Sequence, residues 1–243
     1  MSKLERVNSL ISGLGFELVR YNKATSSILR RTSIFEKYGI NLIIDVGANT
    51  GIYGKEIRDT GYHGKIVSFE PLADAFKKLK ENTVADSKWS IYNFALGAEN
   101  MRQSINISAN SHSSSILQIS DAHTQAETRA SYIGKQDIEI KTLDSIYDEI
   151  KGSAKEVFLK IDTQGFELNV LNGAINSLPF IHTIQLEMSL RPLYAGQPLY
   201  TDLMDFLHAN DYKLIDIEPG FADIKTGTLL QFDGIFRKAN FII

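Results

Sequence analysis

The chain has 243 residues, of which 43% are hydrophobic and 23% charged, and its formal net charge is −3. This composition is typical of a globular protein and argues against disorder, while the length allows one large α/β domain or two small ones. The mildly acidic balance disfavours duplex nucleic acid as the main partner, since binding to phosphates requires a basic face. Because the sequence contains no cysteine, disulfides, thiolate zinc sites and cysteine nucleophiles are excluded.

The first forty residues predict helices rather than a secretory signal. Charged residues such as Glu5 and Glu17 interrupt the apolar positions, and no run in the chain approaches the roughly 18 apolar residues of a spanning helix. We therefore expect a cytoplasmic protein without a transmembrane segment. Apolar residues at helical spacing predict that residues 1–40 form a helical cap packed on the main domain. The alternative is a substrate lid, or a membrane-surface contact through Arg30 and Arg31.

Short apolar runs alternate with helical patterns from Asn41 to the end of the chain. Strands are predicted in the segments NLIIDVG, GKIVSFEP, WSIYNFALG, EVFLKIDTQG, IHTIQLEM, KLIDIE and TLLQFDGIFRK. The helical patterns between most of them predict right-handed crossovers and a parallel sheet covered on both faces. The last two strands are joined only by the turn-rich PGFADIKTG and should pair antiparallel. The prediction is an α/β, Rossmann-like fold: a mostly parallel seven-stranded sheet with an antiparallel last strand.

Residues 100–144 interrupt this alternation within a domain predicted to span residues 41–243. The segment is polar and serine-rich, and two alternating pieces, SINIS and DIEIKTL, predict a β-hairpin or an extension of the sheet edge. The loop between the two pieces is long. Long loops inside a compact domain are usually functional or mobile, so this loop is a candidate for covering a site.

The stretch NLIIDVGANTGIYGKEI predicts a strand that turns directly into a helix. Ligands of open parallel sheets bind beyond the carboxyl ends of the strands, where helix N-termini offer free N–H groups. Gly47 and Gly51 would let the backbone approach a ligand closely. A dinucleotide site would need a glycine where Asn49 stands, and Asp45 would repel a pyrophosphate. The corner therefore suits a ligand that carries a positive amino group.

A second acid, Glu70, ends the next predicted strand, 19 residues after Gly51. This is the position of a carboxylate that binds the two hydroxyls of a ribose. An acid for an ammonium, glycines for close approach and an acid for a ribose together describe a site for S-adenosylmethionine. The structural alternatives are that Asp45 caps a helix and that Glu70 is a surface residue.

Four segments, DVGANTG, FEP, ALG and LKIDTQGFELNVLNGA, together resemble the FkbM family of S-adenosylmethionine-dependent methyltransferases, from about Asn41 to Lys238. The resemblance implies a class I methyltransferase fold. It also implies O-methyl transfer, often to sugars of surface glycans or to secondary metabolites. The chain departs from the commonest family pattern at Gln164, where many members carry an acid, so no carboxylate can act at that position here.

The motif match implies which residues hold the cofactor. The turn that contains Gly47 and Gly51 should line the methionine half of the cofactor, and Glu70 should bind its ribose. The end of the third strand should border the adenine, and the long loop and the end of the fourth strand should lie nearby. The cofactor-binding candidates are Asp45, Gly47, Ala48, Asn49, Gly51, Glu70, Asn93, Phe94, Ala95, Ser114 and Asp162. Core packing is the alternative for Phe94.

Methyl transfer to a hydroxyl needs a base or a metal, because the pKa of a hydroxyl lies far above neutrality. Asp162, at the end of the fourth strand, is the first candidate for general base. Glu187, at the end of the fifth strand, is the second, and His112 in the long loop is the third. Asp162, Glu167 and Glu187 offer oxygen ligands that would suit magnesium, but no three ligands stand at a known spacing, so a divalent metal is not supported.

Two other functions stay open at this stage. A nucleobase N-methyltransferase commonly carries Asn/Asp-Pro-Pro-aromatic after the fourth strand, where this chain has DTQG. A non-catalytic module that binds the cofactor would keep the same glycine corner. The acidic composition favours a small-molecule or glycan acceptor over nucleic acid. The oligomeric state is not predicted.

Overall fold

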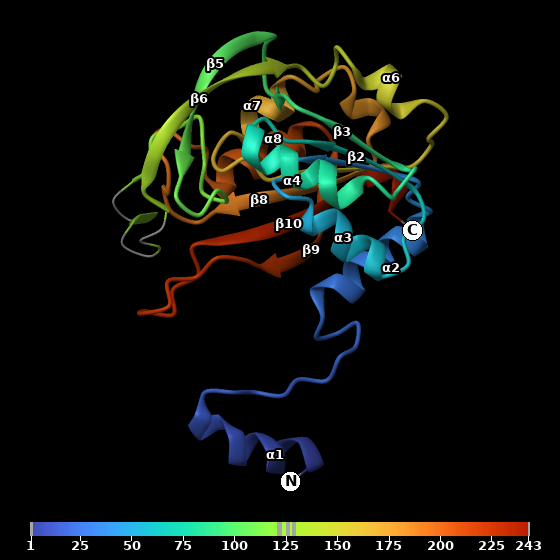
Figure 1. The fold of residues 1–243 in the computed structure, drawn as a ribbon. Coiled ribbons are helices and arrows are strands. Elements are labelled where there is room, and N and C mark those ends of the chain that lie inside the picture. Colours follow the sequence, from blue (N-terminus) through green and yellow to red (C-terminus); the bar gives the residue numbers. More distant parts are fainter. Residues whose placement is uncertain (1, 121–122, 125–126, 128–129, 243) are drawn as a thin grey trace.

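The fold is an α/β arrangement of two sheets with helices around the larger one (Figure 1), seen in a computed structural model that describes residues 2–120, 123–124, 127 and 130–242. Within these residues the large sheet has seven strands in the order β3-β2-β1-β7-β8-β10-β9, and a small sheet has the order β4-β6-β5. The strands of the large sheet are β1 (Leu42–Val46), β2 (Lys65–Phe69), β3 (Trp89–Tyr92), β7 (Val157–Ile161), β8 (Thr183–Ser189), β9 (Tyr212–Pro219) and β10 (Gln231–Lys238).

The pairing of the large sheet confirms the predicted topology. β1 pairs parallel with both β2 and β7, and β7 pairs parallel with β8. β10 is inserted between β8 and β9 and runs antiparallel to both, as the turn-rich connection before it predicts. The strand order reverses beside β1, and the carboxyl ends of β1, β2 and β7 therefore meet at one edge, where ligands of such sheets bind.

Helices cover both faces of the large sheet, and β1 is buried between them. Leu42, Ile44 and Val46 belong to a core shared with α6, α7 and α8. Ile43 faces the opposite way, into a core shared with α2, α3 and α4. The helices are α1 (Lys3–Ile11), α2 (Ser27–Tyr38), α3 (Ile52–Asp59), α4 (Ala73–Thr83), α6 (Tyr147–Lys151), α7 (Glu167–Asn172) and α8 (Tyr200–Ala209), with 3-10 turns η1 (Ser12–Leu14), η3 (Leu178–Phe180) and η4 (Ala239–Phe241).

The segment WSIYNFALG forms two strands, and the prediction of one strand there is wrong. The Asn93 side chain donates to the carbonyls of Glu70 and Pro71 at 2.9 and 3.1 Å, which holds the bend between β3 and the next strand. That strand, β4 (Ala95–Leu96), joins the small sheet through β6 (Tyr132–Lys141), which pairs antiparallel with β5 (Met101–Ser108). The hairpin predicted from the alternating pattern is thus present, as part of a separate sheet.

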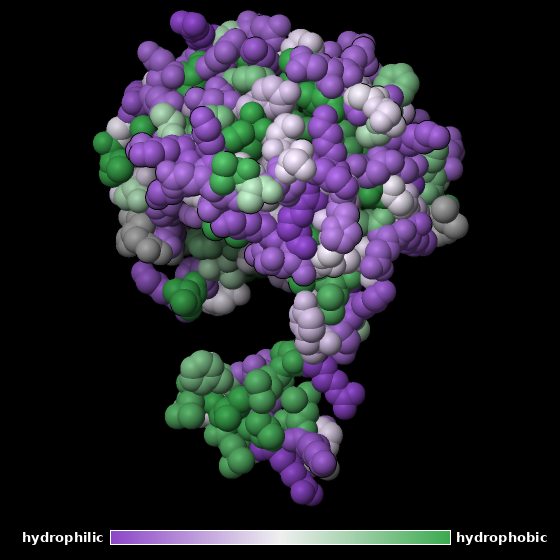
Figure 2. All heavy atoms as spheres, turned by 45° about the vertical axis from the view of Figure 1, so that its right-hand side comes forward, coloured by the Kyte–Doolittle hydropathy of each residue, from purple (hydrophilic) through white to green (hydrophobic). Residues whose placement is uncertain are grey.

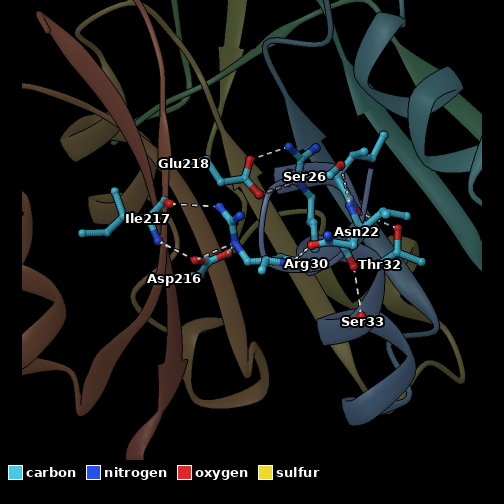
Figure 3. Close-up of polar contacts among 12 residues, drawn as sticks. Asn22, Ser26, Arg30, Thr32, Ser33, Asp216, Ile217 and Glu218 are labelled. Carbon is cyan, nitrogen blue, oxygen red and sulfur yellow. Dashed lines mark hydrogen bonds and ion pairs between the residues drawn. The ribbon is translucent and has the colours of Figure 1, made fainter. Parts of the chain in front are cut away.

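Helix α2 is attached to β9 by two arginines (Figure 3). Arg30 Nε lies 2.8 Å from Asp216 Oδ2 in a partly exposed ion pair. The neighbouring Arg31 is buried and forms a two-pronged pair with Glu218, while its guanidinium lies over the Tyr53 ring. Both guanidinium groups are paired with acids of β9, so the structure does not support a membrane contact through these two arginines, one of the alternatives considered above.

Helix α1 behaves differently from α2. None of its residues is buried, and in Figure 1 it lies well below the sheets, joined to α2 by an extended segment. The packing expected of residues 1–40 is thus seen for α2, through Phe35 and Tyr38, and not for α1. In the part of the chain that the structure describes, no helix is long and apolar enough to cross a membrane.

Candidate active-site cleft

A cleft with a volume of about 250 Å³ lies at the carboxyl ends of β1, β2 and β7. Its floor is the turn after β1, where Gly47 has a φ of +79° and Asn49 a φ of +49°. A Cβ on Gly47 would lie 1.9 Å from the Asp162 carbonyl oxygen, because β1 and β7 are adjacent at this point. The glycine is therefore required twice, for its backbone angle and for the close approach of two strand ends.

Glu70 stands in the wall of the cleft just after β2. Its Oε2 accepts from the Asn49 N–H and its Oε1 from the Leu72 N–H, each at 2.8 Å, so the carboxylate is held rigidly. Burial raises its pKa to about 7, although the two backbone donors oppose this shift. Beside it the cleft is apolar, lined by Phe69, Leu72, Leu96, Ile105 and Ile116. A buried acid next to a flat apolar slot fits a ribose joined to a purine base.

The other end of the cleft holds Asp162, Gln164 and Glu187. Gln164 lies between the two acids, and its Nε2 donates to Asp162 Oδ1 at 2.9 Å and to Glu187 Oε2 at 2.8 Å. The Tyr194 hydroxyl donates to Gln164 Oε1 at 2.7 Å, which fixes the orientation of the amide. Gln164 has a φ of +56°, and its carbonyl accepts from the Ser115 hydroxyl of the covering loop. This amide bridge therefore ties β7, β8 and the serine-rich loop together.

The two acids that flank the amide differ in environment. Burial raises the pKa of Glu187 well above its ordinary value, and the nearby carboxylates of Asp162 and Glu167 raise it further. The Asp162 side chain is 34% exposed and faces the cleft. The shift favours the protonated form of Glu187, which also lines the cleft, and the Asp162 side chain is open to a substrate hydroxyl.

Lys160 lies beneath the cleft and joins two acids of neighbouring strands. Its Nζ lies 3.2 Å from Asp45 Oδ1 and 3.4 Å from Asp162 Oδ2. Burial alone would lower the pKa of Lys160, but the carboxylates of Asp162 and Asp45 raise it above its ordinary value. Asp45 is fully buried and also accepts from the Ser68 hydroxyl. It thus supports Lys160 from below, and its side chain does not line the cleft.

The structure brings together only part of the predicted cofactor and catalytic residues. Those that line the cleft are Gly47, Asn49, Glu70, Ala95, His112, Ser114, Asp162 and Glu187. The others have structural contacts: Asp45 holds Lys160, Asn93 holds the bend after β3, and Gly51 meets the Leu79 side chain of α4. Ala48 and Phe94 lie in the two cores. For these five residues, no cofactor contact is supported by their position.

Sequence reasoning missed the amide bridge. Gln164 stood out only as a departure from the family pattern, and its hydrogen bond with Tyr194 was not predicted. The signal in the sequence was the pair Asp162 and Gln164 after a buried strand, but the partners of Gln164 lie 23 and 30 residues away along the chain. The acids also do not form a metal site: no group of three or more His, Asp or Glu side chains that could hold a metal occurs among the described residues.

Substituting Gln164 by glutamate tests the amide bridge. We expect Gln164→Glu to lower the free energy of unfolding by about 2 kcal/mol at about pH 8, because the half-buried Asp162 and Glu187 lose their shared donor and a third acid is added between them. Because burial raises the pKa of Glu187, this acid binds its proton more tightly in the folded than in the unfolded state. Stability therefore falls as pH rises, and the loss should shrink at about pH 5. Urea denaturation at both pH values measures this.

Gln197→Glu is the matched control for that substitution. Gln197 Oε1 accepts from the N–H groups of Leu193 and Tyr194, and a carboxylate can accept the same two bonds. This variant should lose little stability. Equal losses in both variants, or a loss in Gln164→Glu that does not depend on pH, would show that the donor role of Gln164 is unimportant.

The order of the strands in the large sheet and the cleft at its carboxyl edge define a class I methyltransferase fold. The sequence comparison identifies the family. A family model described as the methyltransferase FkbM domain matches residues 45–214. The chain therefore belongs to the FkbM methyltransferase family. No curated protein matches the sequence.

Three solved structures with a similar fold are distant from this chain in sequence. The FkbM methyltransferase of Methylobacillus flagellatus has 14% identity and a TM-score of 0.49, covering 80% of this chain and 43% of its own. An rRNA methylase of Streptococcus thermophilus has 8% identity and a TM-score of 0.49, covering 90% and 99%. A Streptococcus pneumoniae protein solved with S-adenosyl-L-methionine has 9% identity and a TM-score of 0.48, covering 86% and 72%. The chain thus spans less than half of the Methylobacillus protein.

Proposed function

We propose that this protein transfers a methyl group from S-adenosyl-L-methionine to a hydroxyl of a glycan or a secondary metabolite. The observation that carries the proposal is the arrangement of one cleft, with a rigid buried Glu70 at one end and the accessible Asp162 at the other. The family supports methyl transfer in general. The choice of a hydroxyl acceptor rests on the carboxylate at the far end of the cleft.

The residues of the cleft fit this cofactor. Glu70 would accept hydrogen bonds from the two ribose hydroxyls, and the apolar slot beside it would hold the adenine. The turn at Gly47 and Asn49 lies at the start of α3 and would hold the methionine part. When bound, S-adenosyl-L-methionine supplies an electrophilic methyl group. Asp45 has no place in this arrangement, because it is buried under the cleft with Lys160.

Asp162 is the proposed general base. It is partly exposed in the cleft wall, and Gln164 and Lys160 hold its carboxylate from two sides, so its direction is set before an acceptor arrives. Its role would be to take the proton of the acceptor hydroxyl. The raised pKa of Glu187 favours its protonated form, so it would act as a hydrogen-bonding partner of Gln164 rather than as a base.

The acceptor would enter beside the loop that covers the cleft. Ser111, His112 and Ser114 of this loop line the same cleft as Asp162 and offer polar side chains for a hydroxylated acceptor. The net charge of −3 favours such a molecule over nucleic acid. A non-catalytic cofactor-binding module is the second candidate, and absence of turnover on every acceptor despite tight cofactor binding would favour it.

Calorimetric titration with S-adenosylhomocysteine tests the cofactor site. We expect binding to become about tenfold tighter between about pH 6 and pH 8, because Glu70, with a pKa of about 7, must lose its proton to accept both ribose hydroxyls. Glu70→Gln should bind at least tenfold more weakly at the higher pH and lose the pH dependence. NAD serves as the control ligand and should not bind. Binding of NAD instead, or affinity unchanged in Glu70→Gln, would overturn the proposed cofactor.

A further inference from the structure

Residues 2–23, which we call the N-terminal hook, expose an unusual amount of apolar side chain. Seven large apolar residues of this short segment are between 39% and 79% exposed: Val7, Leu10, Leu14, Phe16, Leu18, Val19 and Tyr21. Figure 2 shows the hook at the bottom of the molecule, with hydrophobic atoms gathered on one side of it. Contiguous apolar surface of this kind in a soluble domain usually marks a binding surface.

The hook is held in shape by its own hydrogen bonds. Ser2 and Glu5 form a capping box that starts α1. Asn8, on the helix, donates through Nδ2 to the Leu18 carbonyl at 2.9 Å and accepts from the Leu18 N–H at 2.8 Å. The helix and the extended segment after it therefore lie side by side. Their apolar side chains form one surface instead of two separate ones.

The charge of the hook is opposite to that of the rest of the chain. The hook carries four basic and two acidic residues, a formal charge of +2, whereas the remaining residues carry 22 basic and 27 acidic ones, a formal charge of −5. The basic residues are Lys3, Arg6, Arg20 and Lys23. An apolar surface flanked by basic residues on an amphipathic helix matches a lipid surface with anionic headgroups.

A second copy of the chain is a less suitable binding partner for the hook than an anionic lipid surface. Pairing of two hooks would bring together two segments of net positive charge. Outside the hook, the exposed large apolar side chains of the described residues come one or two at a time from different elements, such as Val84 after α4, Ile133 in β6 and Ile224 in the β9–β10 loop. The body of a second copy therefore offers no equally concentrated apolar surface.

We propose that the N-terminal hook binds the surface of an anionic lipid bilayer, with Leu10, Leu14 and Phe16 inserted among the lipids and the basic residues at the headgroups. The helix is too short to span a bilayer, so the contact lies in the interface and is reversible. This binding is independent of the proposed methyl transfer, since it uses no residue of the cleft. Its consequence would be to hold the cleft near acceptors carried by a membrane.

Sedimentation of the full chain with vesicles tests the proposal. We expect binding to vesicles of phosphatidylglycerol and phosphatidylcholine, weaker binding to phosphatidylcholine alone, and weakening by salt. The triple variant Leu10→Asp/Leu14→Asp/Phe16→Asp should bind at least tenfold more weakly, and Arg20→Glu/Lys23→Glu should lose the preference for anionic vesicles. The matched control is Val84→Asp/Ile133→Asp/Ile224→Asp, which adds three charges at exposed apolar positions of the body and should bind like the unmodified chain.

Circular dichroism should show the same folded content in all these variants, because none of the substituted hook residues is buried. No binding of the unmodified chain to anionic vesicles would overturn the proposal. So would equal weakening in the hook variant and the body control. If sedimentation velocity shows a dimer that only the hook variant loses, while vesicle binding is unchanged, the hook serves a second copy and the lipid proposal is wrong.

Discussion

Gly47→Ala should lower the free energy of unfolding by about 3 kcal/mol or more, and the variant should not bind S-adenosylhomocysteine. Two costs add at this position. A residue with a Cβ is disfavoured at a φ of +79°. The new Cβ would also lie 1.9 Å from the Asp162 carbonyl oxygen, which is backbone and cannot rotate away. This clash can be removed only if the ends of β1 and β7 move apart at the floor of the cleft.

Gly61→Ala separates the two costs. Gly61 has a φ of +91°, but a Cβ there would meet nothing within 4 Å. This control should lose only about 1–2 kcal/mol, the cost of the backbone angle. Thermal unfolding of both variants, with calorimetric titration of the cofactor product, gives the comparison. Similar stability losses in the two variants would mean that the close approach of the β1 and β7 ends does not constrain the site.

Asp162→Asn should reduce methyl transfer by about 10²–10⁴-fold, the usual contribution of a general base. Binding of S-adenosylhomocysteine should change by less than about threefold, because the substitution leaves Glu70 and the apolar slot untouched. The measurement uses labelled S-adenosyl-L-methionine and a panel of sugars, glycolipids and polyketide alcohols. Rates are then compared on an acceptor that the unmodified protein methylates.

Glu187→Gln is the control for that substitution. Because the raised pKa of Glu187 favours its protonated form, an amide of the same shape should preserve most of the transfer rate, with less than about a tenfold loss. Full transfer by Asp162→Asn would contradict its role as base. A larger loss of transfer rate in Glu187→Gln than in Asp162→Asn would indicate that Glu187 is the general base. Loss of cofactor binding in Asp162→Asn would show that this residue belongs to the cofactor site.

The class of fold and the place of the site could be read from the sequence. Buried strands such as Leu42–Val46 appear as continuous apolar runs, because a parallel strand is covered on both faces. The turn around Gly47 and the acid at Glu70 follow from local rules for strand–helix corners. The structure places both in one cleft, since the carboxyl ends of adjacent parallel strands meet at the same edge.

The role of Asp45 shows where such reading stops. From the sequence, an acid at the end of the first strand looks available to a ligand. The alternation along β1 turns Asp45 to the side of Ile43, which is covered by α2, α3 and α4. The counter-charge of Asp45 is Lys160 of β7, which lies 115 residues later in the chain. Because Lys160 is far from Asp45 in the chain, the sequence around Asp45 does not reveal this ion pair.

Periodicity and turn residues therefore determined, from the sequence alone, the α/β class, the strand–turn–helix corner and the position of Glu70 at the end of the second strand. These features depend on side chains a few positions apart. The tertiary structure alone decided that Asp45 is buried, that Gln164 joins Asp162 to Glu187, and that α1 stands free while α2 packs. Those outcomes depend on pairings between distant strands and loops, whose geometry exists only once the sheet has formed.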